Sequence, residues 1–295
     1  MDSIWSDYIQ TTEELYVSRE TRFTDKNKEL WIKNIGAGPG MKVLEIGCGG
    51  GVFCHKLKKY IPDLDITGLD RDINHITYAR EKAGKLGLEC TFVEGDIGSL
   101  PFADETFDLV YSHTVVEHVP PELFFGEQYR VLKPGGRISV LSVRTGLNLK
   151  NVEVSDQTEE EMDLMKKLWS QAGTASNQYE VGKYEMDEHE YPRKLNHYGF
   201  RDVEVQLFTV MDYCPDNAST SKEEGIMRIN SHRLVSLNQI KKGIRLAPGA
   251  LTEKEIERLE YRINERYDKR LAKYEAETPV WDFTTSSVLA VSGRK

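Results

Sequence analysis

The chain has 295 residues, of which 39% are hydrophobic and 29% are charged. This composition is typical of one large folded domain, or of one domain with an insertion, and it excludes a chain that is disordered throughout. The formal net charge of −9 argues against nucleic acid as a partner, because contact with phosphate backbones requires clustered lysine and arginine.

The amino-terminal residues and the cysteines bear on where the protein works. Residues 1–7 are acidic where a signal peptide would be basic, and no apolar run is long enough to cross a bilayer. The cysteines are Cys48, Cys54, Cys90 and Cys214, and their spacing matches neither a zinc site nor a small secreted domain. We therefore expect a cytoplasmic protein with reduced thiols, no metal site and no membrane partner.

Short apolar runs alternate with helical patterns between residues 41 and 143, as expected for a parallel sheet covered by helices. Strands are predicted at residues 42–46, 65–69, 89–93, 108–111 and 137–143, each apolar enough to be buried on both faces. Helices are predicted after Gly51, over 72–86 and over 121–132, and Gly135 and Gly136 are predicted to form the turn into the fifth strand.

The pattern changes after residue 143. Polar helices are predicted near 158–171 and 185–198, and two strands near 201–211 and 283–292 would form a hairpin with a very long connection. Within that connection Thr252 and Glu255 have capping-box spacing, and apolar residues then recur every three or four positions, which predicts a long amphipathic helix. Its mixed charges favour packing against the main domain or a second copy over a membrane face.

These elements suggest three parts of the chain. Residues 1–35 are expected to form lid helices, 36–213 together with 280–295 a doubly wound α/β core, and 214–279 a helical insertion. A homodimer formed through the insertion is one expectation for its role.

A glycine-rich turn follows the first predicted strand, in the segment from Val43 to Gly51. Glycine allows a positive φ and lets a ligand approach the backbone, and the next helix presents free N–H groups. A dinucleotide fingerprint would need glycine or alanine at position 52, where the sequence has Val52. The NAD-dependent oxidoreductase interpretation is therefore weakened, although it stays open.

Acidic residues end the second and third strands. Asp70 can accept hydrogen bonds from both hydroxyls of a ribose, a feature shared with NAD enzymes. Asp96 can accept a bond from an adenine amino group, and Ile97 can cover the ring. Together the three residues predict an adenosine site.

The sequence resembles the class I, Rossmann-like S-adenosylmethionine-dependent methyltransferases, within the broad group that methylates small molecules. The resemblance covers roughly residues 31–143, in segments that share the order of the family motifs: Val43 to Gly51, Gly68 to Asp70, Glu94 to Asp96, Leu100 to Phe102, Phe107 to Val110, Val116 to Val119 and Leu132 to Gly136.

The resemblance implies a seven-stranded, mostly parallel sheet whose last strand is antiparallel, and S-adenosylmethionine as the cofactor. It places Glu45 near the cofactor's ammonium group. The other cofactor-binding residues that it implies are Gly47, Gly49 and Gly51 at the methionine part, Asp70 at the ribose, Asp96 and Ile97 at the adenine, and also Arg71 and His113. The acceptor is expected to be a small molecule.

Methyl transfer from a sulfonium is a direct displacement, so alignment of the reactants can supply most of the acceleration. If the acceptor must lose a proton, His113 and then His118 are the candidate catalytic bases, with Glu117 beside them. The alternative is that His113 contacts the cofactor through its backbone, while Glu117 and His118 orient their loop.

Aromatic residues on both sides of the core are candidates for a lid over the cofactor and acceptor: Tyr8, Tyr16, Trp31, Trp169, Tyr179, Tyr184 and Tyr191. Acidic residues interleaved with the later ones make an amine acceptor plausible through cation–π and ionic attraction, and a hydroxyl acceptor is the other expectation. A non-catalytic protein that binds the cofactor and regulates a partner is a third interpretation.

Overall fold

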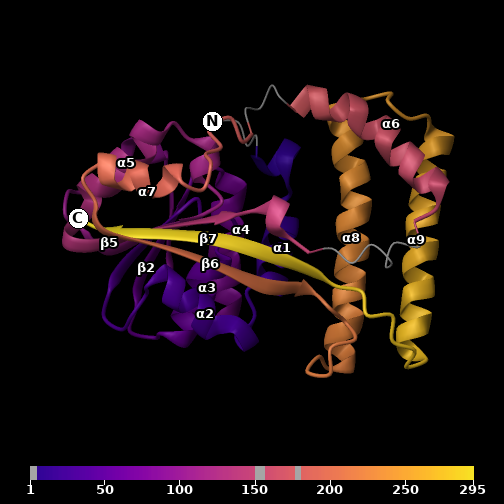
Figure 1. The fold of residues 1–295 in the computed structure, drawn as a ribbon, viewed down its shortest axis with the longest axis horizontal. Helices are drawn as coiled ribbons and strands as arrows, with labels where there is room; N and C mark the ends of the chain where they lie inside the picture. The colour runs from indigo at the N-terminus through magenta and orange to yellow at the C-terminus, as the bar shows by residue number, and fades with distance from the viewer. Residues whose placement is uncertain (1–4, 150–156, 177–180) are drawn as a thin grey trace.

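A seven-stranded sheet forms the centre of the computed structural model, which describes residues 5–149, 157–176 and 181–295. The strands are β1 (Lys42–Ile46), β2 (Asp65–Asp70), β3 (Thr91–Glu94), β4 (Phe107–His113), β5 (Leu132–Val143), β6 (Arg201–Tyr213) and β7 (Thr284–Arg294). Their order is β3-β2-β1-β4-β5-β7-β6, and β7 runs antiparallel to both of its neighbours, β5 and β6 (Figure 1). The predicted Rossmann-like fold with an antiparallel last strand is confirmed.

Helices cover both faces of this sheet, and three of those described, α6 (Glu159–Ser176), α8 (Lys222–Leu246) and α9 (Glu253–Glu275), lie beside it (Figure 1). The other helices are η1 (Trp5–Ile9), α1 (Thr12–Arg22), α2 (Lys28–Ile35), α3 (Val52–Tyr60), α4 (Ile73–Leu86), α5 (Pro121–Val131) and α7 (Glu190–His197). Alternate residues of β1 belong to two separate cores, because successive side chains of a strand point to opposite faces. Val43 packs with the cluster that contains Trp31 and Phe53, and Leu44 packs with the cluster that contains Phe124 and Tyr191.

The fifth strand begins at Leu132, five residues before the predicted start. Phe107 pairs with Leu132 and Leu109 with Arg137, so the register shifts across a turn that contains Gly135 at φ +77°. Backbone bonds of 2.9 Å link Gly135 and Gly136 to Lys295. The predicted glycine turn is therefore present, but hydrogen bonding to the chain end extends the strand around it.

Two long helices, α8 and α9, occupy the segment between β6 and β7, where only one was predicted. The unpredicted helix α8 contains Gly225 and Gly243, residues that lower helix propensity. Both allow close packing: a Cβ at Gly243 would lie 2.6 Å from Leu168, and one at Gly225 would lie 2.0 Å from the Tyr274 hydroxyl. Tertiary packing therefore stabilises a helix that local sequence does not favour.

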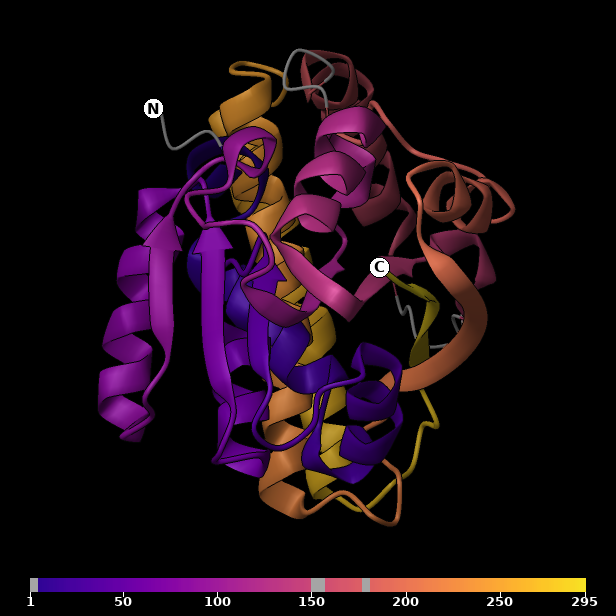
Figure 2. The ribbon, with the colours of Figure 1, turned by 90° about the vertical axis from the view of Figure 1, so that its left-hand side faces the viewer.

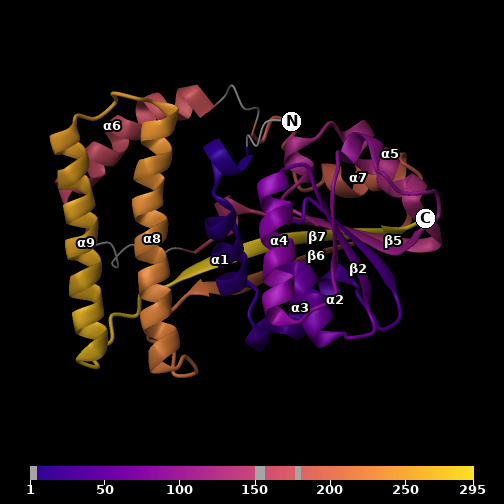
Figure 3. The same cartoon turned by 180° about the vertical axis from the view of Figure 1, so that it is seen from behind.

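Helices α6, α8 and α9 form a third apolar cluster beside the sheet (Figure 1). A buried ion-pair network joins this cluster to the strand ends, because Arg270 of α9 contacts Asp282 at 2.6 Å and Asp216 at 2.7 Å. The Tyr213 hydroxyl donates to Asp282 at 3.0 Å. Figure 3 shows α1 between α8 and α4, so the amino-terminal helix lies against both parts.

None of the helices in the described ranges has the length and apolar character needed to cross a membrane.

Candidate active site

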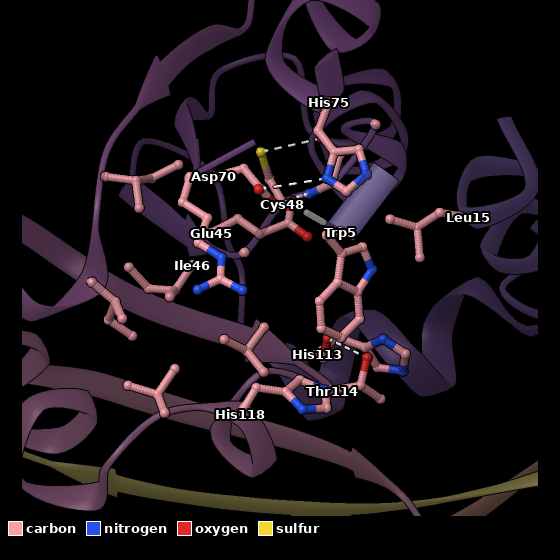
Figure 4. Close-up of a pocket in the computed structure, with 18 of the residues that line it drawn as sticks. Trp5, Leu15, Glu45, Ile46, Cys48, Asp70, His75, His113, Thr114 and His118 are labelled. Carbon is pink, nitrogen blue, oxygen red and sulfur yellow. Dashed lines mark hydrogen bonds and ion pairs between the residues drawn. The ribbon is translucent and has the colours of Figure 1, made fainter. Parts of the chain in front are cut away.

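A cavity of about 290 Å³ opens at the carboxyl ends of the parallel strands. Figure 2 shows the purple strand arrows pointing to one end of the molecule, and ligands of open α/β sheets bind at this end. The cavity is lined by residues from the ends of β1, β2, β3 and β4 and from η1 and α1 (Figure 4). Most of the residues predicted for the site line this cavity: Glu45, Gly47, Gly49, Asp70, Arg71, Asp96, Ile97, His113 and His118.

The glycine turn after β1 forms one wall. Gly47, Gly49 and Gly51 have φ values of +65°, +52° and +82°, a region that favours glycine. Gly51, however, is not among the cavity-lining residues, although the resemblance placed it there. A Cβ at Gly51 would lie 2.8 Å from Phe92 and 3.0 Å from Ala79, so this glycine allows α3 to pack closely. Gly50 lines the cavity in its place.

Asp70, the last residue of β2, is held by backbone groups. Its Oδ2 accepts from the Gly49 N–H at 2.8 Å, and its Oδ1 accepts from the Asp72 N–H at 2.9 Å. The Nδ1 of His75 lies 3.5 Å from Oδ1 (Figure 4). The carboxylate is thus fixed beside the glycine turn, where it retains lone pairs for ligand hydroxyl groups.

Asp96 and Ile97 lie at the end of β3. The Oδ1 of Asp96 accepts from the Gly98 N–H at 2.7 Å and caps the short turn η3 (Ile97–Ser99). Both residues line the cavity, as does Arg71, which follows Asp70. The structure therefore brings the three predicted adenosine residues together.

Glu45 is a buried carboxyl group, 2% exposed, on β1 below the glycine turn. Its Oε2 accepts from the Cys54 thiol at 2.9 Å. Burial raises the pKa of Glu45 from 4.5 to about 8, although the Cys54 bond partly opposes this shift. The neutral form of this side chain therefore predominates at pH 7 in the ligand-free protein.

We expect the raised pKa of Glu45 to make stability depend on pH. The unfolded chain releases this proton near pH 4.5, whereas the folded protein keeps it up to about pH 8, so the contribution is fully present below pH 4.5, falls between these two values and is lost above about pH 8. Glu45→Gln should remove this dependence. Urea unfolding at pH 5.5, 7 and 8.5 gives the unfolding free energy at each pH. This free energy should fall more steeply with pH in the unmodified protein than in Glu45→Gln, and an equal dependence on pH in both proteins would contradict the assignment.

Both candidate histidines are weak bases in this structure. His113 is 6% exposed and packs against the rings of Phe23 and Phe53, and burial, with Arg19 and Arg22 nearby, holds its pKa well below 6.5. Burial and the charge of Arg71 lower the pKa of His118 to about 4. Neither environment stabilises the protonated imidazolium that a general base must become.

Glu117 and His118 contact the segment that precedes α7. The Nδ1 of His118 accepts from the Gly182 N–H at 2.9 Å, and the Glu117 carbonyl accepts from the Tyr184 N–H at 3.0 Å. The Glu117 carboxylate also accepts a bond from the Ser142 hydroxyl. This geometry fits the alternative in which the pair orients a loop.

The predicted aromatic lid is only partly assembled. Tyr16 lines the cavity, but Trp31 is fully buried against Phe23 and Phe53 beneath it. Trp169 on α6 lies near Lys242 of α8, and Tyr191 is buried against Arg144, so neither is among the lining residues. Tyr179 lies outside the described residues.

The amino-terminal segment contributes cavity-lining residues that were not predicted: Trp5, Leu15 and Arg19. Figure 4 shows the Trp5 indole between the Asp70 side of the cavity and the His113 side, and its ring lies 4.8 Å from that of His118. The capping box of Thr11 and Glu14 marks the start of α1 in the sequence. It does not indicate which face of α1 contacts the ligand site.

The fold and the cavity define a Rossmann-like α/β protein with a site for an adenosine-containing ligand. A family model described as "Methyltransferase domain" matches residues 37–197, more than half of the chain, and the chain belongs to this family. The family predicted from the motif series is thereby confirmed.

Individual relatives agree with this membership. The chain is 35% identical to the sterol 24-C-methyltransferase ERG6B of Gibberella zeae over 46% of this chain and 36% of that enzyme. It is 36% identical to phosphoethanolamine N-methyltransferase 3 of Arabidopsis thaliana over 35% of this chain and 21% of that enzyme. The chain thus spans about a third or less of the length of these relatives.

A solved structure shares the fold over nearly the whole chain. It is phosphoethanolamine N-methyltransferase 2 of Haemonchus contortus in complex with S-adenosyl-L-methionine, with a TM-score of 0.54. The alignment covers 99% of this chain and 59% of that one at 18% identity. At this identity the likeness concerns the fold.

Proposed function

We propose that this protein transfers a methyl group from S-adenosylmethionine to a small-molecule acceptor, an amine or a hydroxyl compound. One observation carries the proposal: a glycine turn, the Asp70 carboxylate and the Asp96 carboxylate follow three successive strands of the sheet and line one cavity. Membership in the methyltransferase domain family supports it.

The residues present fit the cofactor. Gly47 and Gly49 line the cavity, and a Cβ at either position would lie 2.5 Å from another cavity-lining side chain, Val115 or Leu15 respectively, so glycine keeps the turn's backbone accessible there. We assign Gly47 and Gly49 to the methionine part, Asp70 to the ribose hydroxyls, and Asp96 with Ile97 to the adenine. Arg71, which follows Asp70, also lines the cavity, and we assign Glu45, another lining residue, to the ammonium group.

When bound, the cofactor supplies an electrophilic methyl group on a sulfonium. The chain's own contribution is to hold the cofactor and align the acceptor with its methyl group, because displacement needs near-attack geometry more than acid–base groups. Trp5, Leu15 and Leu123 add apolar walls that exclude water from the cavity. Because His113 and His118 are weak bases, a protonated amine or a hydroxyl acceptor would lose its proton to water or to another group.

We expect replacement of His118 by asparagine to have a small effect on catalysis. A true general base contributes about 10²- to 10⁴-fold, whereas a group with a pKa of about 4 contributes little as a base at neutral pH. The asparagine oxygen can still accept from Gly182. The value of kcat/KM at pH 7.5 should fall by less than about tenfold, and a loss above a hundredfold would restore His118 as the base.

The proposed activity is tested by release of S-adenosylhomocysteine in the presence of amine, phenol, aliphatic hydroxyl and carboxylate panels. Turnover on amines or hydroxyl compounds is the expected result. Turnover on carboxylates alone would refute the acceptor class. A tight complex with another protein and no turnover on any panel would favour the regulatory interpretation.

The cytoplasmic location, the exclusion of nucleic acid and the homodimer formed through residues 214–279 remain predictions. The net charge of −9 supports the second of them.

A further inference from the structure

We infer that Arg19 of α1, positioned by Thr114, binds the carboxylate at the amino-acid end of the cofactor. This inference rests on the proposed function and names a binding residue that the sequence motifs do not contain. It gives the amino-terminal helix a direct part in cofactor recognition.

Arg19 is a cation in the cavity wall. Its Nη2 donates to the Thr114 hydroxyl at 3.1 Å, and its Nη1 donates to the Ser18 hydroxyl at 2.9 Å. Within the part of the chain that the structure describes, no aspartate or glutamate oxygen lies within 4.0 Å of its guanidinium group. Arg22, one turn further along α1, is paired with Asp212 at 3.6 Å.

The environment of Arg19 favours the binding of an anion. Burial and the charge of Arg22 lower its pKa to about 9. A guanidinium in such a place gains from a carboxylate, which it can bind through two parallel hydrogen bonds. Two neutral hydroxyl groups do not supply that compensation.

Arg19 lies beside the methionine end of the proposed cofactor site. The space above Gly49 is bounded by Leu15, one turn before Arg19 on α1, and the space above Gly47 is bounded by Val115, which follows Thr114. Leu15 and Thr114 both border the cavity in Figure 4. Arg19 and Thr114 therefore approach the glycine turn from two separate elements.

Thr114 has an unusual backbone for a β-branched residue, with φ at +55°. Its hydroxyl donates to the His113 carbonyl at 2.7 Å and accepts from Arg19. Strain of this kind persists where surrounding structure holds it, and it concentrates at ligand sites. Here it directs a hydroxyl group toward the arginine.

The charges in this part of the cavity match an amino acid. The cofactor's amino-acid end carries one ammonium and one carboxylate group. Glu45 is the acid proposed for the ammonium group, and its ionised form, which a neighbouring ammonium would favour, raises the pKa of Arg19. Arg19 thus supplies the opposite charge for the carboxylate.

Two ligands that differ only in this carboxylate test the inference. Calorimetric titration with S-adenosylmethionine and with its decarboxylated form should show that the unmodified protein prefers the first. Arg19→Met should weaken binding of S-adenosylmethionine by about 10- to 100-fold, as expected for loss of a charge-assisted contact. Binding of the decarboxylated form should change by less than about twofold, and Arg19→Lys should recover part of the loss.

Three further variants guard against an indirect effect. Arg22→Met removes the same charge from the same helix outside the cavity wall and should leave the preference between the two ligands intact. Thr114→Val removes the positioning hydroxyl and should reduce that preference, whereas Thr114→Ser should keep it. Equal weakening of both ligands in Arg19→Met, or no weakening of either, would overturn the inference. If the unmodified protein binds neither ligand, the proposed function fails and this inference fails with it.

Discussion

Replacement of Asp70 by alanine is expected to weaken S-adenosylmethionine binding by at least about tenfold, and up to about a hundredfold. Hydrogen bonds to a charged acceptor contribute about 1.5–3 kcal/mol, and each 1.4 kcal/mol corresponds to about a tenfold change in affinity. Asp70 also accepts from Gly49 and Asp72, so its loss relaxes the turn that the cofactor contacts. Calorimetric titration of the folded variant measures the effect.

A matched control lies at the other end of the same strand. Asp65 begins β2 and is exposed, away from the cavity, so Asp65→Ala should bind the cofactor normally. Asp70→Asn keeps one acceptor oxygen and should fall between the two. Unchanged affinity of a folded Asp70→Ala protein would refute the ribose assignment.

Replacement of Gly51 by alanine should destabilise the fold by about 2–5 kcal/mol. The residue has φ +82°, and a Cβ there would lie 2.8 Å from Phe92 and 3.0 Å from Ala79, two buried side chains. Left-handed backbone costs an L-residue about 1–2 kcal/mol, and overpacking of a core adds about 1–3 kcal/mol. Urea unfolding monitored by circular dichroism measures the change.

Gly40 separates the two costs. Its φ of +74° is similar, but nothing lies within 4 Å of the position that a Cβ would take. Gly40→Ala should therefore lose only the backbone contribution, about 1–2 kcal/mol. An equal loss in both variants would show that packing around Gly51 is not tight, and the distinction drawn here between Gly51 and its lining neighbours would fail.

The core of the fold is readable from sequence because its signals are local. Each parallel strand is a short apolar run, and β1 is placed at the same residues, 42–46, by the pattern and by the structure. The limits of β5 depend instead on a long-range pairing of Gly135 and Gly136 with Lys295, which no local pattern records. Helix α8 likewise depends on close contacts that Gly225 and Gly243 permit.

The residues of the candidate site likewise differ in whether local sequence signals or long-range contacts place them. Gly47, Asp70 and Asp96 follow strands that are adjacent in the sheet, so the topology brings them together. Trp5 and Arg19 reach the cavity only because the amino-terminal segment folds back over it, as the Ser6 N–H bond to Asp72 at 2.9 Å illustrates. Motif spacing gave no means of separating Gly51 from Gly49, since both have positive φ and differ only in their neighbours.

The central claim is tested most directly by calorimetric titration of the purified protein with S-adenosylmethionine, S-adenosylhomocysteine and NADH. The arrangement of Gly49, Asp70 and Asp96 predicts micromolar binding of the first two ligands and none of the third. Binding of NADH alone would contradict the claim and would favour an oxidoreductase.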